Sequence, residues 1–512
     1  MTAQPRPDVP DPTTPVAPTG SDVPEQVRVR REKYDRLLAA GTPPYPLGAP
    51  RDARLAGLRE RWAGLETDTS TGEVVSITGR VVLSRNGGKL CFATLQEGDA
   101  TLQVMVSLDG VGPDRLAAWK SDVDLGDHVG ITGEVISSRR GELSVLASQW
   151  LLTSKALRPL PEKHHGLTDP ELRIRQRYLD LVVNPDSRRM VQDRATVVRA
   201  VRDVLHDHGY VEVETPVLQT VHGGAAARPF STHLNALDLD MTLRIALELY
   251  LKRLIVGGID RVFEIGRIFR NEGVDSTHSP EFTMLEFYEA YGDYDTVADT
   301  TREMVLEAAR RAGRTRVPDG QGGEIDLEQP WRSATLHELV SDAVGEPVGA
   351  GTPLERVVAL AEKHDVALQD GWDAGEVVLE LYEKLVEHTL LQPTFVRDYP
   401  VSARPLARDH RDDPRLAEAW DLVVAGTELA TGYSELVDPV EQRRRLTEQS
   451  VKAAGGDQEA MQLDEDFLRA LEHGMPPTGG QGMGIDRLVM LLTGSPIRET
   501  ILFPLVRPQP LA

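Results

Sequence analysis

The chain has 512 residues, and its 57 Lys and Arg residues against 80 Asp and Glu residues give a net charge of −23. This length exceeds the roughly 250–300 residues at which one hydrophobic core usually stops growing, so we expect at least two domains. The negative charge excludes nucleic-acid binding through the overall field of the protein, so any RNA contact must rest on local basic patches. The single cysteine, Cys91, excludes an internal disulfide, and no apolar run reaches the roughly 18–20 residues of a membrane span, so we expect a cytoplasmic protein without a membrane partner.

The N-terminal part of the chain shows three successive patterns. Residues 1–23 are rich in Pro, Thr and Asp without apolar periodicity, which predicts a disordered tail. Pro24–Leu38 has the pattern of a basic amphipathic helix, whose charges either are solvated or contact RNA backbone. Val74–Leu152 contains short alternating segments separated by turn residues such as those at 86–88. This spacing predicts a five-stranded barrel of the oligonucleotide-binding (OB) type, so that 24–155 forms a first domain.

One aromatic residue of this barrel is a candidate for stacking a single-stranded base. Phe92 follows Gly87, Gly88 and Lys89 on a predicted strand, and exposed aromatic residues on such strands stack bases. The pattern alone is equally consistent with Phe92 as part of the barrel core. The following segment, Lys155–Arg177, is basic and contains prolines, so we interpret 156–186 as an interdomain linker whose charge either is solvated or faces RNA.

Further helical and strand patterns follow over 187–512, which we expect to form the second domain that the length of the chain predicts. Ser187–His208 has a helical apolar period that Gly209 ends, and a short strand, Tyr210–Glu214, follows. Thr242–Val256 is predicted to be a helix after a short strand. Its Glu248 lies on a mostly apolar surface, where a carboxylate must be paired or bind a ligand.

A long β-hairpin is predicted over Arg261–Tyr291, with Arg270 and Glu272 at its polar tip. Taken alone, it is better interpreted as a surface ribbon with solvated charges. The stretch 311–392, which contains the helical patterns Leu354–His364 and Glu376–Leu390, is interpreted as a helical insertion.

Two further stretches carry charged residues among apolar or glycine residues. Trp420–Leu436 predicts two core strands joined at Gly426, and carboxylates inside such strands suggest bound cations. Gly479–Arg487 predicts a glycine-rich turn that opens a helix, a geometry in which backbone approaches phosphate closely. Together, Arg270 and Arg487 would form a clamp for a polyphosphate.

Three of these segments, 209–216, 261–291 and 479–487, resemble the signature motifs of class II aminoacyl-tRNA synthetases. Segments 157–181, 222–230 and 235–241 are similar to the lysyl-tRNA synthetases, of the bacterial, actinobacterial-like kind, and the likeness covers roughly Pro24–Pro508. The resemblance implies an α+β fold, in which an OB-fold barrel precedes a class II catalytic domain built on an antiparallel sheet flanked by helices. It also implies an ATP-dependent ligase that activates L-lysine as lysyl-adenylate and transfers lysine to tRNA(Lys), with Mg²⁺ as cofactor. A homodimer is implied, with its interface at the helix and strand over 187–214.

The resemblance further implies the residues of each site. ATP is expected to contact Arg270, Glu272, His278, Phe282, Glu428, Gly484 and Arg487, of which Arg270 and Arg487 are the catalytic residues. Lysine is expected to contact Gly224, Glu248, Arg270, Glu286, Tyr288, Thr431, Tyr433 and Glu435. Mg²⁺ is expected at Asp421 and Glu428, and anticodon nucleotides at Arg85, Phe92, Gln103 and Glu142.

The chemistry of these residues agrees with amino-acid activation, which needs positioning and charge neutralisation rather than a side-chain nucleophile. A pocket with several carboxylates favours lysine over aspartate or asparagine, because a neutral or acidic side chain would leave charge unpaired. Thr431, Tyr433 and Leu247 depart from the Asn, Phe and Pro that are commonest in the family, so analogue tolerance is less defined than the reaction.

Two other functions remain open. One is a paralogue that activates lysine but transfers it to a non-tRNA acceptor. Such paralogues can lack the N-terminal barrel that is predicted for this chain. The other is an RNA-binding or regulatory protein with a decayed synthetase domain, against which the intact residues Arg270, Glu272, Glu428 and Arg487 argue.

Overall fold

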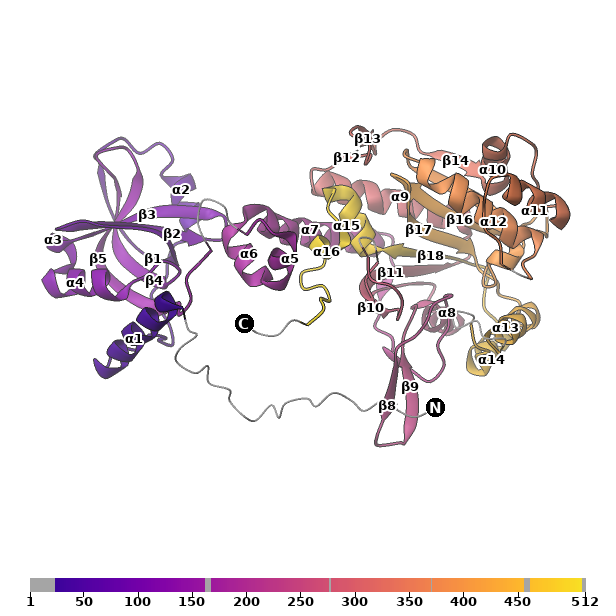
Figure 1. The fold of residues 1–512 in the computed structure, drawn as a ribbon, viewed down its shortest axis with the longest axis horizontal. Coiled ribbons are helices and arrows are strands. Elements are labelled where there is room, and N and C mark those ends of the chain that lie inside the picture. The colour runs from indigo at the N-terminus through magenta and orange to yellow at the C-terminus, as the bar shows by residue number, and fades with distance from the viewer. Residues whose placement is uncertain (1–23, 162–166, 276–277, 370, 455–460, 509–512) are drawn as a thin grey trace. The chain divides into compact units, whose positions relative to one another are not determined.

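The computed structural model describes residues 24–161, 167–275, 278–369, 371–454 and 461–508 (Figure 1). The chain divides into two compact units, Met1–Arg188 and Arg189–Ala512. The tail predicted over 1–23 and residues 162–166 of the predicted linker lie outside the described residues. Among the residues described, no helix is long and apolar enough to cross a membrane.

The first unit contains a closed barrel with the strand order β1-β2-β3-β5-β4, which confirms the predicted five-stranded barrel. Its core forms because apolar residues alternate along the strands: Cys91, Ala93 and Leu95 of one strand are buried in it. The strands are β1 (Ser70–Asn86), β2 (Leu90–Glu97), β3 (Ala100–Ser107), β4 (His128–Ser137) and β5 (Leu143–Ser154). The helices of this unit are α1 (Glu25–Ala39), α2 (Leu55–Arg61), α3 (Leu108–Val111), α4 (Pro113–Asp122), α5 (Pro170–Arg175) and α6 (Arg177–Val183).

Two basic residues from the predicted helix and linker form contacts inside this unit. Arg30 of α1 is buried, and its Nη2 donates a hydrogen bond of 2.9 Å to the carbonyl oxygen of Leu125. The Lys155 ammonium is buried 2.6 Å from Asp124 Oδ2 and 2.7 Å from Asp127 Oδ2. For these two cations, both expectations, solvent exposure and RNA contact, are therefore wrong, because each is satisfied by partners within the unit.

The second unit is built on an eight-stranded sheet with the order β14-β15-β16-β17-β18-β11-β10-β6. All neighbouring strands are antiparallel except the outermost pair at each edge, β14 with β15 and β6 with β10. The strands are β6 (Val211–Glu212), β10 (Arg261–Phe269), β11 (Glu281–Ala290), β14 (Arg332–Thr335), β15 (Thr394–Pro400), β16 (Leu416–Val424), β17 (Thr427–Ser434) and β18 (Thr478–Gly484). Smaller sheets contain β7 (Leu218–Gln219), β8 (Ser231–Leu234) and β9 (Leu239–Leu243), and β12 (Arg316–Pro318) with β13 (Glu324–Asp326).

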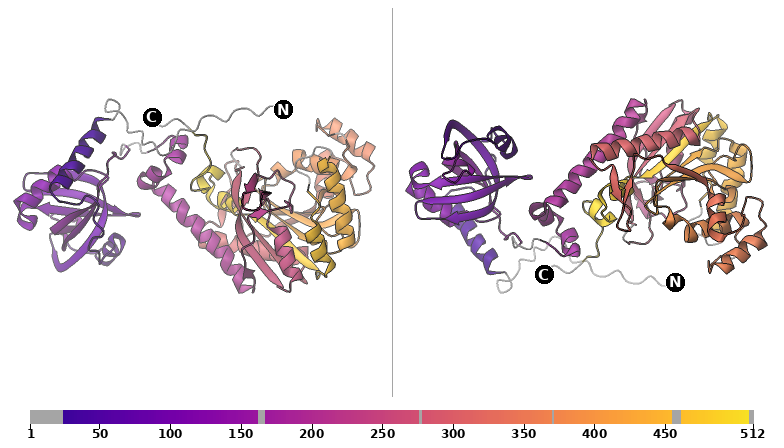
Figure 2. Two further views of the ribbon diagram at one scale, coloured as in Figure 1. Left: turned by 90° about the horizontal axis from the view of Figure 1, so that it is seen from below. Right: turned by 90° about the horizontal axis from the view of Figure 1, so that it is seen from above.

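Helices pack against the large sheet (Figures 1 and 2), and on one face they form its main core. The core there packs α7 (Pro185–Asp207), α9 (Tyr294–Arg311) and α15 (Ile485–Thr493) against Phe287, Trp420 and Met483 of the sheet. The remaining helices are α8 (Glu248–Val256), α10 (Leu336–Val344), α11 (Leu354–Lys363), α12 (Ala374–Leu385), α13 (Pro439–Ala454), α14 (Glu465–Glu472) and α16 (Ile497–Thr500), with 3₁₀ turns η1 (Glu387–Thr389) and η2 (Val401–Ala403). On the other face, α10–α12 pack against residues such as Val396 at one end of the sheet, α8 and α14 pack against residues such as Val262 at the other end, and polar side chains lie between them.

The predicted hairpin over Arg261–Tyr291 is confirmed, because β10 and β11 pair from Arg261 opposite Glu289 to Phe269 opposite Glu281. The helix predicted over Thr242–Val256 begins only at Glu248, since Leu239–Leu243 pairs with β7 and β8 as a strand. The apolar residues before Glu248 satisfy a strand pattern as well as a helical one, which explains the error.

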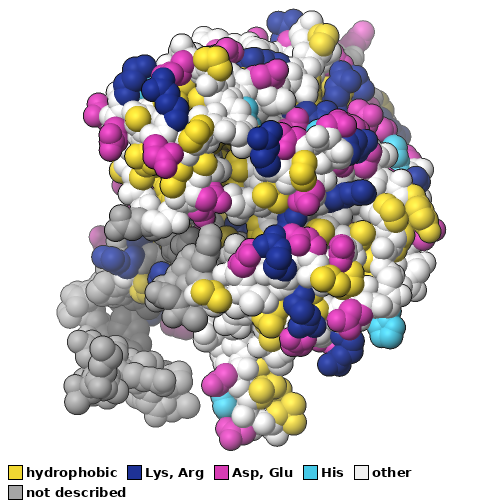
Figure 3. All heavy atoms as spheres, turned by 90° about the vertical axis from the view of Figure 1, so that its right-hand side faces the viewer, with side chains coloured by type: hydrophobic (Ala, Val, Ile, Leu, Met, Phe, Trp, Pro, Cys, Tyr) yellow, Lys and Arg dark blue, Asp and Glu magenta, His cyan; other side chains and the backbone are white. Residues whose placement is uncertain are grey.

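The glycine-rich stretch Gly479–Gly484 is a strand, so the prediction of a turn there is wrong, although a helix does open directly after it. Glycine disfavours strands in general, but here side chains of the neighbouring strands crowd Gly480 and come close to Gly482. A Cβ atom on Gly480 would lie 2.0 Å from Glu435 Oε1, and one on Gly482 would lie 3.0 Å from Met284 Cε. On the face of the molecule in Figure 3, acidic and basic side chains are interspersed, so the net negative charge is not gathered there in one patch.

Candidate active site

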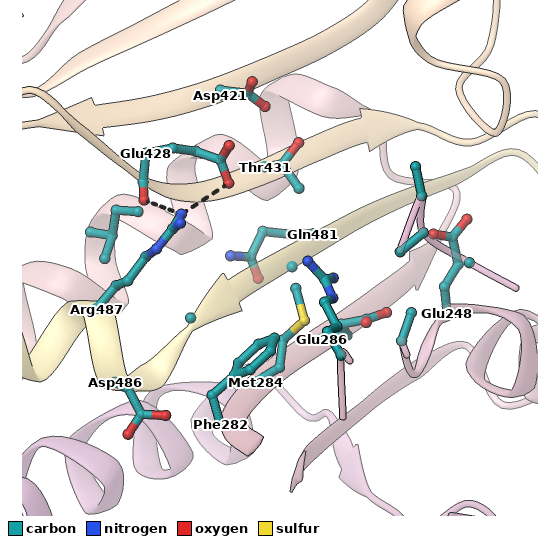
Figure 4. Close-up of a pocket in the computed structure, with 18 of the residues that line it drawn as sticks. Glu248, Phe282, Met284, Glu286, Asp421, Glu428, Thr431, Gln481, Asp486 and Arg487 are labelled. Atoms are coloured by element: carbon teal, nitrogen blue, oxygen red, sulfur yellow. Dashed lines mark hydrogen bonds and ion pairs between the residues drawn. The ribbon is translucent and has the colours of Figure 1, made fainter. Parts of the chain in front are cut away.

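A cavity of about 430 Å³ lies against the polar face of the large sheet (Figure 4). The strand register builds its floor, because Glu286 lies opposite Gly482, Gly482 opposite Thr431, and Thr431 opposite Asp421. Directly paired residues in antiparallel strands project from the same face, so these side chains form one row across the sheet. Gly482 leaves the centre of that row open for a ligand.

One end of the cavity is rich in buried carboxylates. Glu248 of α8, Glu286 of β11 and Glu435 after β17 are each at most 5% exposed. The Glu286 carboxylate accepts hydrogen bonds from the Leu247 N–H at 2.9 Å and from the Tyr288 hydroxyl at 3.0 Å. Burial, together with the nearby charge of Glu248, raises the pKa of Glu286 to about 8. This end of the cavity is therefore suited to a ligand that brings positive charge.

A buried lysine that sequence reasoning missed lies among these acids. The Lys252 Nζ atom is 2.6 Å from Glu248 Oε1 and 2.5 Å from Glu435 Oε2, and the residue is 0% exposed. The two carboxylates raise the pKa of Lys252 against the opposing effect of burial, so its ammonium group stays charged. The four-residue spacing from Glu248 on one helix was the available signal, since side chains at that spacing are neighbours.

The other residues expected to contact lysine line the same end. Gly224 has φ of +86°, and a Cβ there would lie 3.1 Å from Glu248 Cβ, so only glycine brings its backbone this close. Thr431 donates a hydrogen bond of 3.4 Å to the Trp420 carbonyl oxygen. Tyr433 lies opposite Gly480, one row along the sheet from Thr431.

The opposite end of the cavity carries the residues expected to bind ATP. The Arg270 guanidinium lies 5.3 Å from the centre of the Phe282 ring, and its Nε donates to the Ile245 carbonyl oxygen at 3.4 Å. Arg487 Nη1 donates to the Glu428 carbonyl oxygen at 2.8 Å and lies 3.5 Å from its carboxylate (Figure 4). Gly484, the last residue of β18, also lines this end.

The loop at the hairpin tip contributes two exposed residues to the same cavity. Glu272 Oε1 accepts a hydrogen bond of 3.3 Å from the Arg228 N–H, and the His278 N–H donates to Asp275 Oδ1 at 2.8 Å. All the residues expected at the catalytic, ATP, lysine and metal sites therefore line one cavity.

Two acids expected to hold Mg²⁺, Asp421 and Glu428, lie on neighbouring strands. Asp421 is buried, and its Oδ2 is 2.5 Å from Nη2 of Arg404. Arg404 was not predicted from the sequence, because it lies in an irregular segment. Asp421 Oδ1 is buried without a hydrogen-bond partner among the described residues, which suits a ligand for a hard cation. Within the described part of the chain, no three Asp, Glu, His or Cys residues form one metal-binding group.

Asp486, which the sequence also did not identify, fixes the position of the neighbouring Arg487. Its carboxylate accepts from the Thr283 N–H at 2.6 Å and is 2.5 Å from Arg194 Nη1. These bonds hold the start of α15 against β11 and α7.

Three of the four residues expected to bind the anticodon share the outer face of the barrel. Phe92 lies opposite Arg85 on one side and Met105 on the other, while its neighbours Cys91 and Ala93 are buried. Phe92 is half-buried and stands outside the barrel core, so the core interpretation is wrong. Gln103 is two residues from Met105 on that face.

The fourth residue, Glu142, is exposed in the turn before β5, and its carboxylate is 3.3 Å from Arg59 Nη2. Gln103 Nε2 donates a hydrogen bond of 2.8 Å to Ser144 Oγ, two residues beyond Glu142. The four side chains therefore belong to one region of the barrel.

Known protein families match both units of the chain. Residues 169–507 match the family described as tRNA synthetases class II (D, K and N), and residues 75–153 match the OB-fold nucleic acid binding domain. A lysine–tRNA ligase of Kineococcus radiotolerans is 59% identical over 491 residues, which cover 95% of this chain and 98% of that protein. A lysine–tRNA ligase of Mycolicibacterium gilvum is 57% identical over 499 residues, covering 97% and 99%.

A third relative is a bifunctional protein of Rhodococcus opacus named for lysylphosphatidylglycerol biosynthesis. It is 50% identical over 496 residues, which cover 96% of this chain but only 44% of that longer protein. The full-length relatives, with higher identity, are thus the ligases. The chain belongs to the class II tRNA synthetases and, within that family, to the lysine–tRNA ligases.

Proposed function

We propose that the cavity binds L-lysine at its acid-rich end and ATP at its arginine-rich end. The two substrates react there to activate lysine, which is then transferred to tRNA(Lys). The observation that supports this is the single row of side chains across β11, β18, β17 and β16, which runs between the two ends. In the first step an oxygen of the lysine carboxylate forms a bond to the α-phosphorus, and the bond from that phosphorus to the bridging oxygen of pyrophosphate breaks. In the second step a ribose hydroxyl of tRNA attacks the lysyl carbonyl carbon, and AMP leaves.

The two arginines carry the first step by orientation and charge. Arg270 would bridge the lysine carboxylate and the α-phosphate, because its planar guanidinium presents paired donors to both anions. Phe282 would stack one face of adenine, with Arg487 on the other face reaching the γ-phosphate. Glu272 would accept from the adenine amino group, and His278 would contact the outer phosphates. Gly484, before α15, would bring backbone close to the nucleotide.

Mg²⁺ would be held by Asp421 and Glu428, with the remaining ligands supplied by phosphate oxygens. When bound, it supplies charge that offsets the negative charge of the triphosphate. The unpartnered Asp421 Oδ1 supports this assignment.

Selection of lysine would rest on the three buried carboxylates and on Tyr288. Glu248 would bind the α-ammonium group, while Glu286 and Glu435 with Tyr288 would bind the ε-ammonium group. A neutral or acidic amino acid would leave these charges buried and unpaired. The cost in binding free energy would be several kcal/mol, about the cost of removing one partner of a buried ion pair. Backbone at Gly224 and the side chains of Thr431 and Tyr433 would close the remaining sides.

The outer face of the barrel would bind the anticodon of tRNA(Lys), with Phe92 stacking one base and Arg85, Gln103 and Glu142 contacting its neighbours. Phe92→Ala is expected to lower aminoacylation of tRNA(Lys) at least tenfold, since stacking contributes about 1–3 kcal/mol per base. Lysine-dependent ATP–pyrophosphate exchange should stay within twofold. Gln96→Ala, on the same strand and face, is the matched control.

Transfer of lysine to a non-tRNA acceptor is the second candidate, favoured by the bifunctional relative from Rhodococcus opacus. An unchanged rate of tRNA aminoacylation in the Phe92→Ala variant would argue against anticodon reading by the barrel, whereas lysine-dependent exchange without aminoacylation of tRNA(Lys) by the unmodified protein would support the other acceptor.

We propose a homodimer that works in the cytoplasm. The edge position of β6 and the exposed side chains of Val211 and Tyr291 support an interface with a second copy at this edge of the sheet. Sedimentation at micromolar concentration should give twice the mass of the chain, and a monomer mass would contradict the dimer. The single cysteine is compatible with a reducing compartment.

The direct test of the reaction is ATP–pyrophosphate exchange with purified protein and Mg²⁺. Exchange should depend on L-lysine and stay at background with aspartate or asparagine. A folded sample without lysine-dependent exchange would contradict the proposed function.

A further inference from the structure

The acid-rich end of the cavity contains one positive charge that belongs to the protein itself. Lys252 is fully buried between two of the three carboxylates, with its Nζ 2.6 Å from Glu248 Oε1 and 2.5 Å from Glu435 Oε2. Each bridge uses one oxygen of its carboxylate. The second oxygen of Glu435, Oε1, is buried without a hydrogen-bond partner among the described residues.

The direction of this unpartnered oxygen is fixed by the floor of the cavity. A Cβ on Gly480 would lie 2.0 Å from Glu435 Oε1, and Gly480 lies in the row that contains Tyr288 and Tyr433. Glu435 therefore presents Oε1 to the space above Gly480, while Lys252 occupies Oε2. The lysine side chain and a ligand in the cavity can use opposite oxygens of the same carboxylate.

The charges at this end balance a dicationic ligand only when Lys252 is included. Glu248, Glu286 and Glu435 carry three negative charges when ionised, and Lys252 carries one positive charge. The remainder is two negative charges, which equals the two ammonium groups of lysine. The carboxylate of the substrate would be matched separately by Arg270. Without Lys252, one buried carboxylate would remain unpaired beside a bound lysine, a costly state.

We infer that Lys252 is a positioning residue that stays bound to Glu248 and Glu435 and sets the net charge of the lysine pocket to match two ammonium groups. This inference rests on the proposed function, since it assigns the charge of that same site. The opposite role, in which Lys252 only occupies the place of the substrate ammonium and leaves on binding, would require a buried ammonium to find new partners elsewhere.

The groups facing Lys252 and its partners come from several elements. They are Glu248 on α8, Glu286 and Tyr288 on β11, and Glu435 after β17, while Arg270 at the hairpin tip faces Glu286. Removal of the Lys252 charge would raise the pKa of Glu435, because that carboxylate would lose its closest cation. Lysine binding, which needs the Glu435 carboxylate ionised, would then shift to higher pH.

The test compares Lys252→Met with Lys155→Met in lysine-dependent ATP–pyrophosphate exchange. Lys155 is the matched control because it is also a buried lysine between two carboxylates, those of Asp124 and Asp127, but lies in the barrel unit. Lys252→Met should raise the KM for lysine at least tenfold at pH 7.5, leave the KM for ATP within twofold, and move the midpoint of the lysine pH profile upward between pH 6.5 and 8.5. Lys155→Met should leave both KM values within twofold.

An unchanged or lower KM for lysine in Lys252→Met would overturn the inference, and a lower one would indicate that Lys252 competes with the substrate. An unshifted pH profile with a raised KM would also overturn it, because a role in packing alone moves no pKa. Absence of lysine-dependent exchange in the unmodified protein would overturn the proposed function and the inference together.

A charge-balanced double variant keeps the test decisive if Lys252→Met does not fold. Glu248→Gln alone leaves one net negative charge in the pocket, whereas Glu248→Gln with Lys252→Met restores two. The double variant should therefore have a KM for lysine several-fold lower than Glu248→Gln alone. A higher KM in the double variant would show that Lys252 supports the pocket by packing and not by charge.

Discussion

Substitution of Gly480 by alanine tests whether the glycine strand leaves space for lysine. An added Cβ would lie 2.0 Å from Glu435 Oε1 and 2.5 Å from Tyr288 Cε1, both closer than atoms in contact allow. Both neighbours belong to the acid-rich end, so the clash falls on the proposed lysine site. Glu435 would have to move, which disturbs its 2.5 Å bridge to Lys252.

The expected magnitude follows from the usual cost of overpacking a tight site, about 1–3 kcal/mol. Since about 1.4 kcal/mol corresponds to a factor of ten in an equilibrium constant, the KM for lysine should rise about 5- to 150-fold. The KM for ATP should stay within about twofold, because Phe282 and Arg487 lie at the other end. Exchange kinetics with each substrate varied in turn measures both constants.

The adjacent residue provides a matched control, because neighbouring residues of a strand face opposite sides. Gln481 is among the residues that line the cavity (Figure 4), but it lies opposite Phe287 of the helix-covered core, and both atoms of its amide are buried without a partner among the described residues. Gln481→Leu should leave both KM values unchanged and raise stability to thermal unfolding by about 1–3 kcal/mol, the cost of an unsatisfied buried polar group. Equal effects of Gly480→Ala on lysine and ATP, or a loss of lysine binding in Gln481→Leu, would refute this assignment of the two faces.

Four further predictions concern three carboxylates. Burial raises the pKa of Glu286 to about 8, so below that pH a bound lysine must displace a proton from this carboxyl group. The KM for lysine should therefore fall as pH rises from 6.5 to 8, by up to about tenfold per pH unit. A KM that does not change over this range would contradict the prediction. By the same shift, the protein without lysine should lose stability as pH rises from the ordinary pKa of Glu286, 4.5, through about 8, which thermal melts across that range would measure. Glu435→Gln should raise the KM for lysine about 10- to 100-fold, because a hydrogen bond to a charged group contributes about 1.5–3 kcal/mol. The KM for ATP should change little. An equal rise in both KM values would argue against a role of Glu435 in binding lysine. Asp421→Asn should raise the Mg²⁺ concentration that gives half-maximal exchange about tenfold or more. The affinity for lysine in the absence of ATP, measured by calorimetry, should not change. An unaltered Mg²⁺ requirement would contradict the assignment of Asp421 to the metal site.

Elements with a clear periodicity could be predicted from the sequence. The alternation of Cys91, Phe92 and Ala93 indicates a barrel strand, but it does not say which side faces inward; the neighbouring strands settle that Phe92 lies outside. The hairpin β10–β11 could be predicted because its loop is rich in Gly, Asp and Pro between two apolar runs. The motif resemblance then supplied the site residues, all of which line one cavity or one region of the barrel.

Other features depend on tertiary contacts that local sequence does not contain. Glycine propensity favours a turn over Gly479–Gly484, whereas crowding by Glu435, Tyr288 and Met284 selects glycine within a strand. Arg404 has no motif, and only the fold brings it 2.5 Å from Asp421. Lys252 was detectable from its spacing to Glu248, but its second partner, Glu435, lies 183 positions further along the chain and could not be inferred.

A crystal structure with a non-hydrolysable analogue of lysyl-adenylate would show whether the ribbon β10–β11 holds both substrates. The ε-ammonium group should lie within hydrogen-bond distance of Glu286 and Tyr288, and the adenine ring should stack on Phe282 with its amino group at Glu272. An analogue bound outside this cavity, or bound with its lysyl group at the Arg487 end, would contradict this arrangement.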